Sequence, residues 1–162
     1  MNYDEMIISI GKGDMDALEC LYNALYTDVF AYLCSIIQDS AVSADIAQDT
    51  FVKIYDSAGK FHPRGYGKAW VMKIAKNLAL NEIKRRKREH EEFPTQAYSE
   101  DGEMLYIKQS LAELKTSERE IVMLKAYGYS HKEISNILEI PAGTVRWKYS
   151  AAIKKMKVEL AY

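Results

Sequence analysis

Residues 129–157 have the sequence YSHKEISNILEIPAGTVRWKYSAAIKKMK, and the helix start and stop signals in this stretch decide the fold of the C-terminal part of the chain. Ser130 and Glu133 match the S/T-x-x-E capping box, in which each side chain bonds a free N–H at a helix start. We therefore expect a short helix over 130–138, a turn in EIPAG and a longer basic helix over 144–160. A short helix, a tight turn with glycine and a second helix together form a helix-turn-helix.

The residues before this motif extend the same helical unit. Ser117 and Glu120 match a second capping box, which predicts a helix that begins near residue 118 and that Gly128 ends. Cations concentrate on the helix after the turn, where a recognition helix presents its first residues to DNA bases and later ones to phosphates. A plain three-helix core is the alternative. The packed side comprises Ile134, Ile137, Leu138, Val145, Tyr149, Ile153 and Met156.

A segment with many acids and few aliphatic residues precedes this unit. Residues 89–103, EHEEFPTQAYSEDGE, have the composition of an interdomain linker. Such a segment could extend to about 40 Å, so two modules could reach separate sites on one DNA duplex, one turn of which is about 34 Å. We predict domains over 1–90 and 104–162, joined by a flexible acidic linker over 91–103.

The N-terminal part also has helical periodicity. Helices are predicted over 15–37, 42–57 and 69–88, and residues 57–68, SAGKFHPRGYGK, form a loop because they hold three glycines and a proline. Long alternating strand patterns are absent, so the predicted fold is all-α. The apolar stripe of the first of these helices comprises Leu18, Leu21, Leu25, Val29, Leu33 and Ile36.

Charge is strongly segregated along the chain, although the formal net charge is only -1. Residues 1–58 hold ten acids against two lysines, whereas residues 68–88 hold eight Lys or Arg and one acid, Glu82. Charge blocks of this kind are typical of interaction surfaces. The near-neutral total therefore hides two surfaces of opposite sign.

A helical wheel of residues 70–88 separates an apolar arc from a polar face. The run 84–88, KRRKR, is interpreted as an end that holds phosphates, and Glu82, which falls in the apolar arc, is attributed to fraying near the helix end. Trp70 falls among the polar residues, where it either stacks on nucleic acid or packs against the preceding loop. The polar face comprises Lys73, Lys76, Asn77, Asn81, Lys84 and Arg88.

The loop before this helix alternates aromatic residues with cations. Aromatic rings can stack on unpaired bases while cations follow the nucleic-acid backbone, so the loop suits single-stranded DNA. A surface loop pinned by one aromatic residue is the alternative. The alternating residues are Lys60, Phe61, Arg64, Tyr66, Lys68 and Trp70.

The sequence gives no positive reason to predict an enzyme, a metal site or a cofactor. Cys20 and Cys34 are interpreted as small buried residues in a reducing compartment, and the three histidines have no metal-ligand spacing. No apolar stretch approaches the roughly 20 residues of a membrane span, and the acidic N-terminus lacks a secretory signal pattern. We therefore expect a cytoplasmic protein without membrane insertion.

Two blocks of the chain resemble a known family. DIAQDTFVKIYDSAGKF and KAWVMKIAKNLALNEIKRRKR, within 45–88, resemble region 2 of bacterial sigma factors of the extracytoplasmic-function class. LAELKTSEREIVMLKAYGYSHKEISNILEIPAGTVRWKYSAAIKKMK, residues 111–157, is similar to their region 4. The resemblance implies a sigma factor that binds core RNA polymerase and recognises −10 and −35 promoter elements. It also implies three partners: core polymerase through its β′ and β subunits, promoter DNA, and an anti-sigma factor. A stand-alone helix-turn-helix regulator, with an effector or dimerisation domain before the linker, is the alternative.

The family's functional residues map onto three surfaces of this chain. The resemblance implies that the D-x-x-Q-D helix docks on the β′ coiled coil through Asp45, Gln48 and Asp49, supported by Ile46 and Phe51. The implied −10 residues are Phe61, Arg64, Trp70, Lys73, Lys76, Asn77, Asn81 and Lys84. The implied −35 residues are Thr144, Arg146, Trp147, Lys148, Ser150, Lys154 and Lys155.

The chain departs from the family pattern in the last helix. Trp147 stands where the family commonly has a small residue, and Ala151 and Ile153 stand where it commonly has arginines. Two fewer cations should weaken phosphate anchoring and lower the salt dependence of binding, by about one unit of slope for each lost contact. The −35 sequence that this chain reads is therefore expected to be atypical.

Overall fold

The computed structural model describes residues 1–89 and 109–160, and every regular element in these ranges is a helix. The chain divides into two compact units, Met1–Pro94 and Thr95–Tyr162. The predicted all-α fold with two helical units is thus confirmed. The predicted linker, 91–103, lies outside the described residues, and the exact domain boundaries stay predictions.

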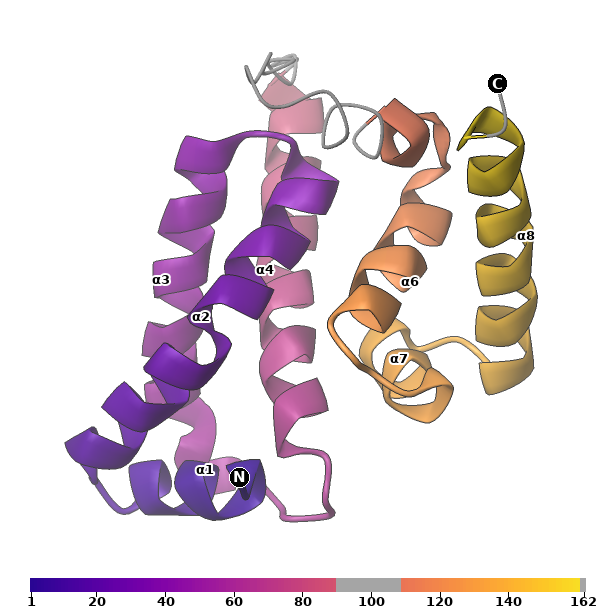
Figure 1. Ribbon diagram of the computed structural model, residues 1–162. Coiled ribbons are helices and arrows are strands. Elements are labelled where there is room, and N and C mark those ends of the chain that lie inside the picture. The colour runs from indigo at the N-terminus through magenta and orange to yellow at the C-terminus, as the bar shows by residue number, and fades with distance from the viewer. Residues whose placement is uncertain (90–108, 161–162) are drawn as a thin grey trace. The chain divides into compact units, whose positions relative to one another are not determined.

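The first unit is a helical bundle (Figure 1). Helices α2, α3 and α4 pack along one another, and α1 lies across the end of the bundle at which α4 begins. The described elements are α1 (Tyr3–Gly11), α2 (Met15–Ile37), α3 (Ser40–Ser57), the 3-10 helix η1 (Ala58–Lys60) and α4 (Gly67–Glu89).

Short polar side chains begin the first three helices. Asn2, Asp14 and Asp39 each accept a hydrogen bond from the N–H three residues later, at 3.3, 3.0 and 3.1 Å. Such caps satisfy N–H groups that have no partner within the helix. Helix α2 begins and ends where predicted, whereas α3 begins two residues earlier than predicted because Asp39 caps it.

Helix α2 is the central core helix of the first unit. Its predicted apolar stripe is buried from Leu21 to Ile36, and Leu18 is half-buried. By length and composition alone α2 could also cross a membrane. In the bundle, however, its apolar face packs against α1, α3 and α4, which is the arrangement of a core helix.

The second unit contains the predicted helix-turn-helix. Residues 109–113 are helical, and α6 (Thr116–Ala126), α7 (His131–Leu138) and α8 (Ala142–Leu160) follow. Helices α7 and α8 are separated by a short turn, in which Glu139 adopts the left-handed conformation. Of the predicted packed side, four residues are buried (Ile134, Ile137, Leu138 and Val145) and the other three are half-buried.

One of the two predicted capping boxes is present and the other is wrong. Ser130 Oγ accepts from the Glu133 N–H at 3.2 Å, and the Glu133 carboxylate accepts from the Ser130 N–H at 2.8 Å. Ser117, by contrast, lies inside α6, because the helix begins at Thr116, two residues before the predicted start, and the Glu118 carboxylate accepts from the Lys115 N–H at 3.1 Å. The S-x-x-E pattern alone does not reveal which of two neighbouring glutamates reaches the helix start.

Candidate nucleic-acid interface

The polar face of α4 follows one line along the helix. Residues 73, 77, 81, 84 and 88 are spaced at three or four positions, so they share a face. Asn77, Asn81 and Lys84 are exposed, as is Arg88, and Lys73 is half-buried. This face presents two amides between cations, a combination that can contact both bases and phosphates.

Lys76 does not belong to the open part of this face. It is only 9% exposed, so its placement on the solvent side of the helical wheel is wrong. A wheel shows only the geometry of the helix itself, whereas α4 packs against α1, α2 and α3, which cover much of its circumference. The aliphatic stem of a lysine can be buried in this way. A DNA contact by Lys76 stays an untested prediction.

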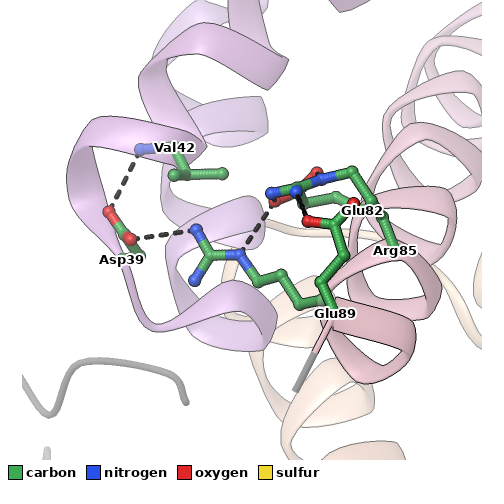
Figure 2. Close-up of polar contacts among 6 residues, drawn as sticks. Asp39, Val42, Glu82, Arg85 and Glu89 are labelled. Atoms are coloured by element: carbon green, nitrogen blue, oxygen red, sulfur yellow. Dashed lines mark hydrogen bonds and ion pairs between the residues drawn. The ribbon is translucent and has the colours of Figure 1, made fainter. Parts of the chain in front are cut away.

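The KRRKR run is not a uniform phosphate-binding end (Figure 2). Arg86, with a side chain only 6% exposed, donates from Nε to Glu82 at 2.8 Å and from a terminal nitrogen to Asp39 at 3.0 Å. Arg85 donates to Glu82 at 2.9 Å and also to Glu89. Two of the five cations are therefore engaged in ion pairs, and one of them, Arg86, joins α4 to the residue that caps α3.

Glu82 is an ion-pair partner, so its attribution to a frayed helix end is wrong. Hydrogen bonds from Arg85 and then Arg86 lower the pKa of Glu82 to about 2. A hydrogen bond from the Val42 N–H, reinforced by Arg86, lowers the pKa of Asp39. Asp39 thus caps α3 with one oxygen and pairs with α4 through the other, which joins the two helices.

The loop before α4 is held at both ends. Phe61 packs on Trp70 with ring centroids 5.0 Å apart, so Trp70 packs against the loop, which was one of its two expected placements. At the other end, the Asp4 carboxylate of α1 accepts from the backbone N–H groups of Arg64, Gly65 and Gly67. Sequence reasoning missed Asp4, because nothing near it in the sequence signals a partner some 60 residues away.

The start of α8 presents an exposed surface with polar and aromatic side chains. Arg146 and Ser150 are exposed, Thr144 is half-buried, and Trp147 is 70% exposed. An indole this exposed is covered only in small part by its own unit, so the position stands out from the buried apolar residues of the helix. The surface offers a guanidinium, a hydroxyl and a flat aromatic ring together.

Two lysines of α8 bond to α6. Lys148 Nζ donates to Ser117 Oγ at 3.1 Å, and Lys155 Nζ donates to the buried Glu118 carboxylate at 2.8 Å. The Lys155 hydrogen bond is the largest cause that lowers the pKa of Glu118. Lys154 and Lys157 are exposed. Of the later cations, Lys155 thus has a structural role that its position in a basic helix does not reveal.

The predicted docking face of α3 has acids outside and apolar residues inside. Asp45, Gln48 and Asp49 are exposed, whereas Ile46 and Phe51 are 8% and 5% exposed. The Phe51 ring packs on Tyr22 with centroids 4.8 Å apart. The acidic face is therefore carried on a helix whose other side is anchored in the aromatic core of the bundle.

The cysteines differ from the prediction. Cys20 is exposed, so its assignment as a buried residue is wrong, while Cys34 is half-buried and its burial raises the pKa of the thiol. Burial also lowers the pKa of His131, with smaller contributions from Lys125 and Arg146. Across residues 1–89 and 109–160, no group of His, Cys, Asp or Glu side chains could hold a metal ion.

Two family models match the chain, one in each unit. Sigma-70 region 2 matches residues 21–89, and Sigma-70, region 4 matches residues 104–156. The chain therefore belongs to the sigma-70 family of RNA polymerase sigma factors. It directs promoter-specific transcription initiation, and the stand-alone regulator is not better supported, because its first unit matches a sigma region rather than an effector domain.

Individual relatives narrow the class to extracytoplasmic-function (ECF) sigma factors. RNA polymerase sigma factor CarQ of Myxococcus xanthus is 26% identical over 156 residues, with 90% of each chain covered. ECF RNA polymerase sigma factor SigW of Bacillus subtilis is 24% identical, covering 99% of this chain and 97% of the relative.

Solved structures show the same fold. The sigma factor RpoE from Bartonella quintana, in complex with the anti-sigma factor NepR, has a TM-score of 0.78 at 22% identity and covers 88% of this chain and 96% of its own. CnrH, in complex with the cytosolic domain of CnrY, has a TM-score of 0.76 at 20% identity, with coverages of 99% and 98%.

Proposed function

We propose that three surfaces of this sigma factor each make a different contact during transcription initiation. The loop before α4 and the polar face of α4 contact the −10 element, the start of α8 reads the −35 element, and the acidic face of α3 binds core polymerase. One observation carries the proposal: α4 and α8 each turn exposed amide, cationic or aromatic side chains away from a buried apolar face. Such a face is available to DNA without any rearrangement of the core.

On α4, the amides supply base recognition and the cations supply anchoring. Asn77 and Asn81 lie one helical turn apart, and each amide can donate and accept, as a base edge requires. Lys73 and Lys84 flank them on the same face and suit phosphates, with Lys76 as a further proposed contact. The Phe61–Trp70 pair and Arg64 border this face and suit an unstacked base of the opened strand.

On α8, the exposed first turns suit the major groove. Arg146 can donate two hydrogen bonds to guanine, Trp147 can contact a thymine methyl group, and Ser150 can bond either base type. Thr144 and Lys154 suit backbone contacts at the two ends of this surface. Lys148 and Lys155 add positive charge while they are bonded to α6.

On α3, the exposed carboxylates suit a basic partner. Asp45, Gln48 and Asp49 form a compact polar patch, and we assign to it the β′ subunit of core polymerase, with the β subunit as a further contact of the sigma factor. Ile46 and Phe51 are buried, so they hold the patch in place and do not themselves form the docking surface. Electrostatic complementarity of this kind favours fast and specific association.

Regulation and location follow from the same family. The two solved neighbours are bound to the anti-sigma factor NepR and to the cytosolic domain of CnrY. We infer that an anti-sigma protein also holds this chain by covering its DNA-binding and polymerase-binding surfaces. The chain is then cytoplasmic, and it associates with the nucleoid when it is bound to polymerase.

Transcription in vitro tests the proposal. Core polymerase and the full chain are incubated with a library of random DNA duplexes, and templates that yield transcripts are selected. We expect transcripts from a shared promoter only when both proteins are present. Asn77→Ala should lower the yield about tenfold, while Asn23→Ala, which removes an exposed asparagine of α2, should leave it unchanged.

Two outcomes would contradict the proposal. The first is the absence of a promoter-dependent product with every DNA in the library. The second is tight and sequence-specific duplex binding by the chain alone, with no effect of core polymerase. That second result would identify a stand-alone regulator instead.

A further inference from the structure

Asp4 makes an unusual set of contacts with the loop before α4. One carboxylate oxygen accepts from the backbone N–H groups of Arg64 at 2.8 Å and Gly65 at 2.7 Å. The other accepts from the N–H of Gly67 at 2.6 Å. Gly67 is the first residue of α4, so a side chain from α1 caps a helix that begins 63 residues later in the chain. Hydrogen bonds to an ionised group are about twice as strong as neutral ones.

The loop is built to accept this carboxylate. Gly65 has a φ of +76°, a left-handed conformation that glycine adopts without strain. A Cβ atom on Gly67 would lie 2.7 Å from the Asp4 carboxylate and 2.8 Å from the backbone of Tyr3. Both glycines are therefore needed for the backbone to approach Asp4 this closely.

The contact places an anion beside a surface that we assign to DNA. Asp4 is only 9% exposed, and three N–H groups together with the positive end of α4 surround its charge. Its charge is thus directed into the protein, while the Arg64 side chain is exposed. A carboxylate that contacted DNA directly would repel it, so Asp4 acts on the loop.

We propose that Asp4 is a positioning residue for promoter opening, which holds the loop over 61–66 in the shape that captures an unstacked base. The inference rests on the proposed −10 role of this loop and adds the residue that sets its conformation. Asp4 lies outside the part of the chain that matches region 2, which begins at residue 21. Through Asp4, helix α1 would thus influence the capture of an unstacked base by the loop.

Amide hydrogen exchange tests the contact itself. In the free protein, Asp4→Asn should speed exchange at the amides of Gly65 and Gly67 about tenfold, because an asparagine cannot accept from all three donors. Glu5→Gln is the matched control, since it removes an exposed acid from the same turn of α1. Ile7 and Ile10 are buried in the wild-type protein, and we expect them to keep α1 in place in both variants. Unchanged exchange in Asp4→Asn would overturn the proposal.

Opening kinetics test the function. Holoenzyme is mixed with the promoter that the wild-type protein selects, carrying 2-aminopurine in the −10 region, and the fluorescence rise is timed. Asp4→Asn should open the promoter about tenfold more slowly, with binding of the closed complex within twofold of wild type. Three outcomes would overturn the proposed role of Asp4. They are opening of the promoter by Asp4→Asn at the wild-type rate, equal slowing of opening by Glu5→Gln, and a loss of closed-complex binding as large as the slowing of opening.

A second variant changes the loop without touching Asp4. Gly65→Ala has open space around the new methyl group but opposes the left-handed conformation, so it should slow opening about fivefold. Gly13→Ala, which is equally open and has a φ of +92°, is the matched control and should not slow opening. If Gly65→Ala opens the promoter as fast as Gly13→Ala, the proposal is wrong. A wild-type protein that selects no promoter would instead overturn the proposed function and leave the exchange result standing.

Discussion

The two basic helices, α4 and α8, each carry exposed cations and a cation that bonds a carboxylate of the protein. The two helices differ in how deeply the bonded cation is buried. In α4, Arg86 is turned inward, with a side chain 6% exposed, and bonds carboxylates on two helices. In α8, Lys155 bonds one buried carboxylate while its own side chain stays 48% exposed. Arg86 of α4 is therefore a structural residue. Lys155 of α8 stabilises the fold through Glu118 and also leaves much of its side chain on the surface.

The difference follows from the chemistry of the two side chains. A guanidinium presents several donors in a fixed plane, so Arg86 can bond Glu82 and Asp39 at once with little freedom left. An ammonium on a flexible stem loses less hydration when it stays near the surface, as Lys155 does. A run of cations in a sequence therefore overstates the charge that DNA meets, and the overstatement is larger for buried arginine.

The largest expected effect comes from breaking the inward contact of α4. Arg86→Met keeps the volume but leaves the Asp39 and Glu82 carboxylates without this partner, so it should lower the free energy of unfolding of the first unit by about 4 kcal/mol. Urea unfolding followed by Trp70 fluorescence, in a Trp147→Phe background, measures this loss. Lys87→Met, which removes an exposed cation next to it, should cost less than about 0.5 kcal/mol. Equal losses in the two variants would show that Arg86 has no special role.

The same network predicts how the stability of the first unit depends on pH. The pKa of Glu82 falls from 4.5 to about 2 on folding, so its contribution is fully present above pH 4.5 and is lost as the pH falls toward about 2. The loss should reach about 3 kcal/mol. Urea unfolding at pH 6 and pH 3 should therefore show a larger decrease for wild type than for Glu82→Gln. Parallel decreases would contradict the assignment.

The corresponding contact of α8 should be weaker. Lys155→Ala should lower the unfolding free energy of the second unit by about 1 kcal/mol, because the lysine is half exposed and solvent screens the pair. Lys154→Ala, the neighbouring exposed cation, should change it by less than about 0.5 kcal/mol. Thermal unfolding followed by circular dichroism compares the two. A greater loss from Lys154→Ala would reverse the roles assigned here.

The smallest effect separates the two lysines by their DNA contacts. The measurement is the dependence of the log binding constant on log salt concentration, for holoenzyme on its selected promoter. The magnitude of its negative slope should decrease by about one unit for Lys154→Ala. It should fall by less for Lys155→Ala, whose ammonium is partly neutralised by Glu118. Lys84→Ala on α4 should match Lys154→Ala, since Lys84 is exposed. Equal slopes for Lys154→Ala and Lys155→Ala would show that the bond to Glu118 does not change the contribution of Lys155 to DNA binding.

Local signals predicted most of the helices, whereas the polar contacts that sequence reasoning missed between elements are long-range. The α7 capping box and the bounds of α2 depend on residues within one or two helical turns, and both were predicted correctly. The Arg86–Asp39, Lys155–Glu118 and Asp4–Gly67 contacts join residues 47, 37 and 63 positions apart. No periodicity or motif connects such pairs, because their partners meet only when helices pack.

The sequence by itself determined the helical class, the helix-turn-helix and the family, since apolar spacing, caps and short motifs are local properties of the chain. Only the tertiary structure decided which charges face outward. Arg86 and Lys76 look like their exposed neighbours in the sequence, yet both are buried. Burial depends on which helices cover a side chain, and a buried charge needs partners, which Arg86 finds in Glu82 of its own helix and in Asp39 at the start of α3.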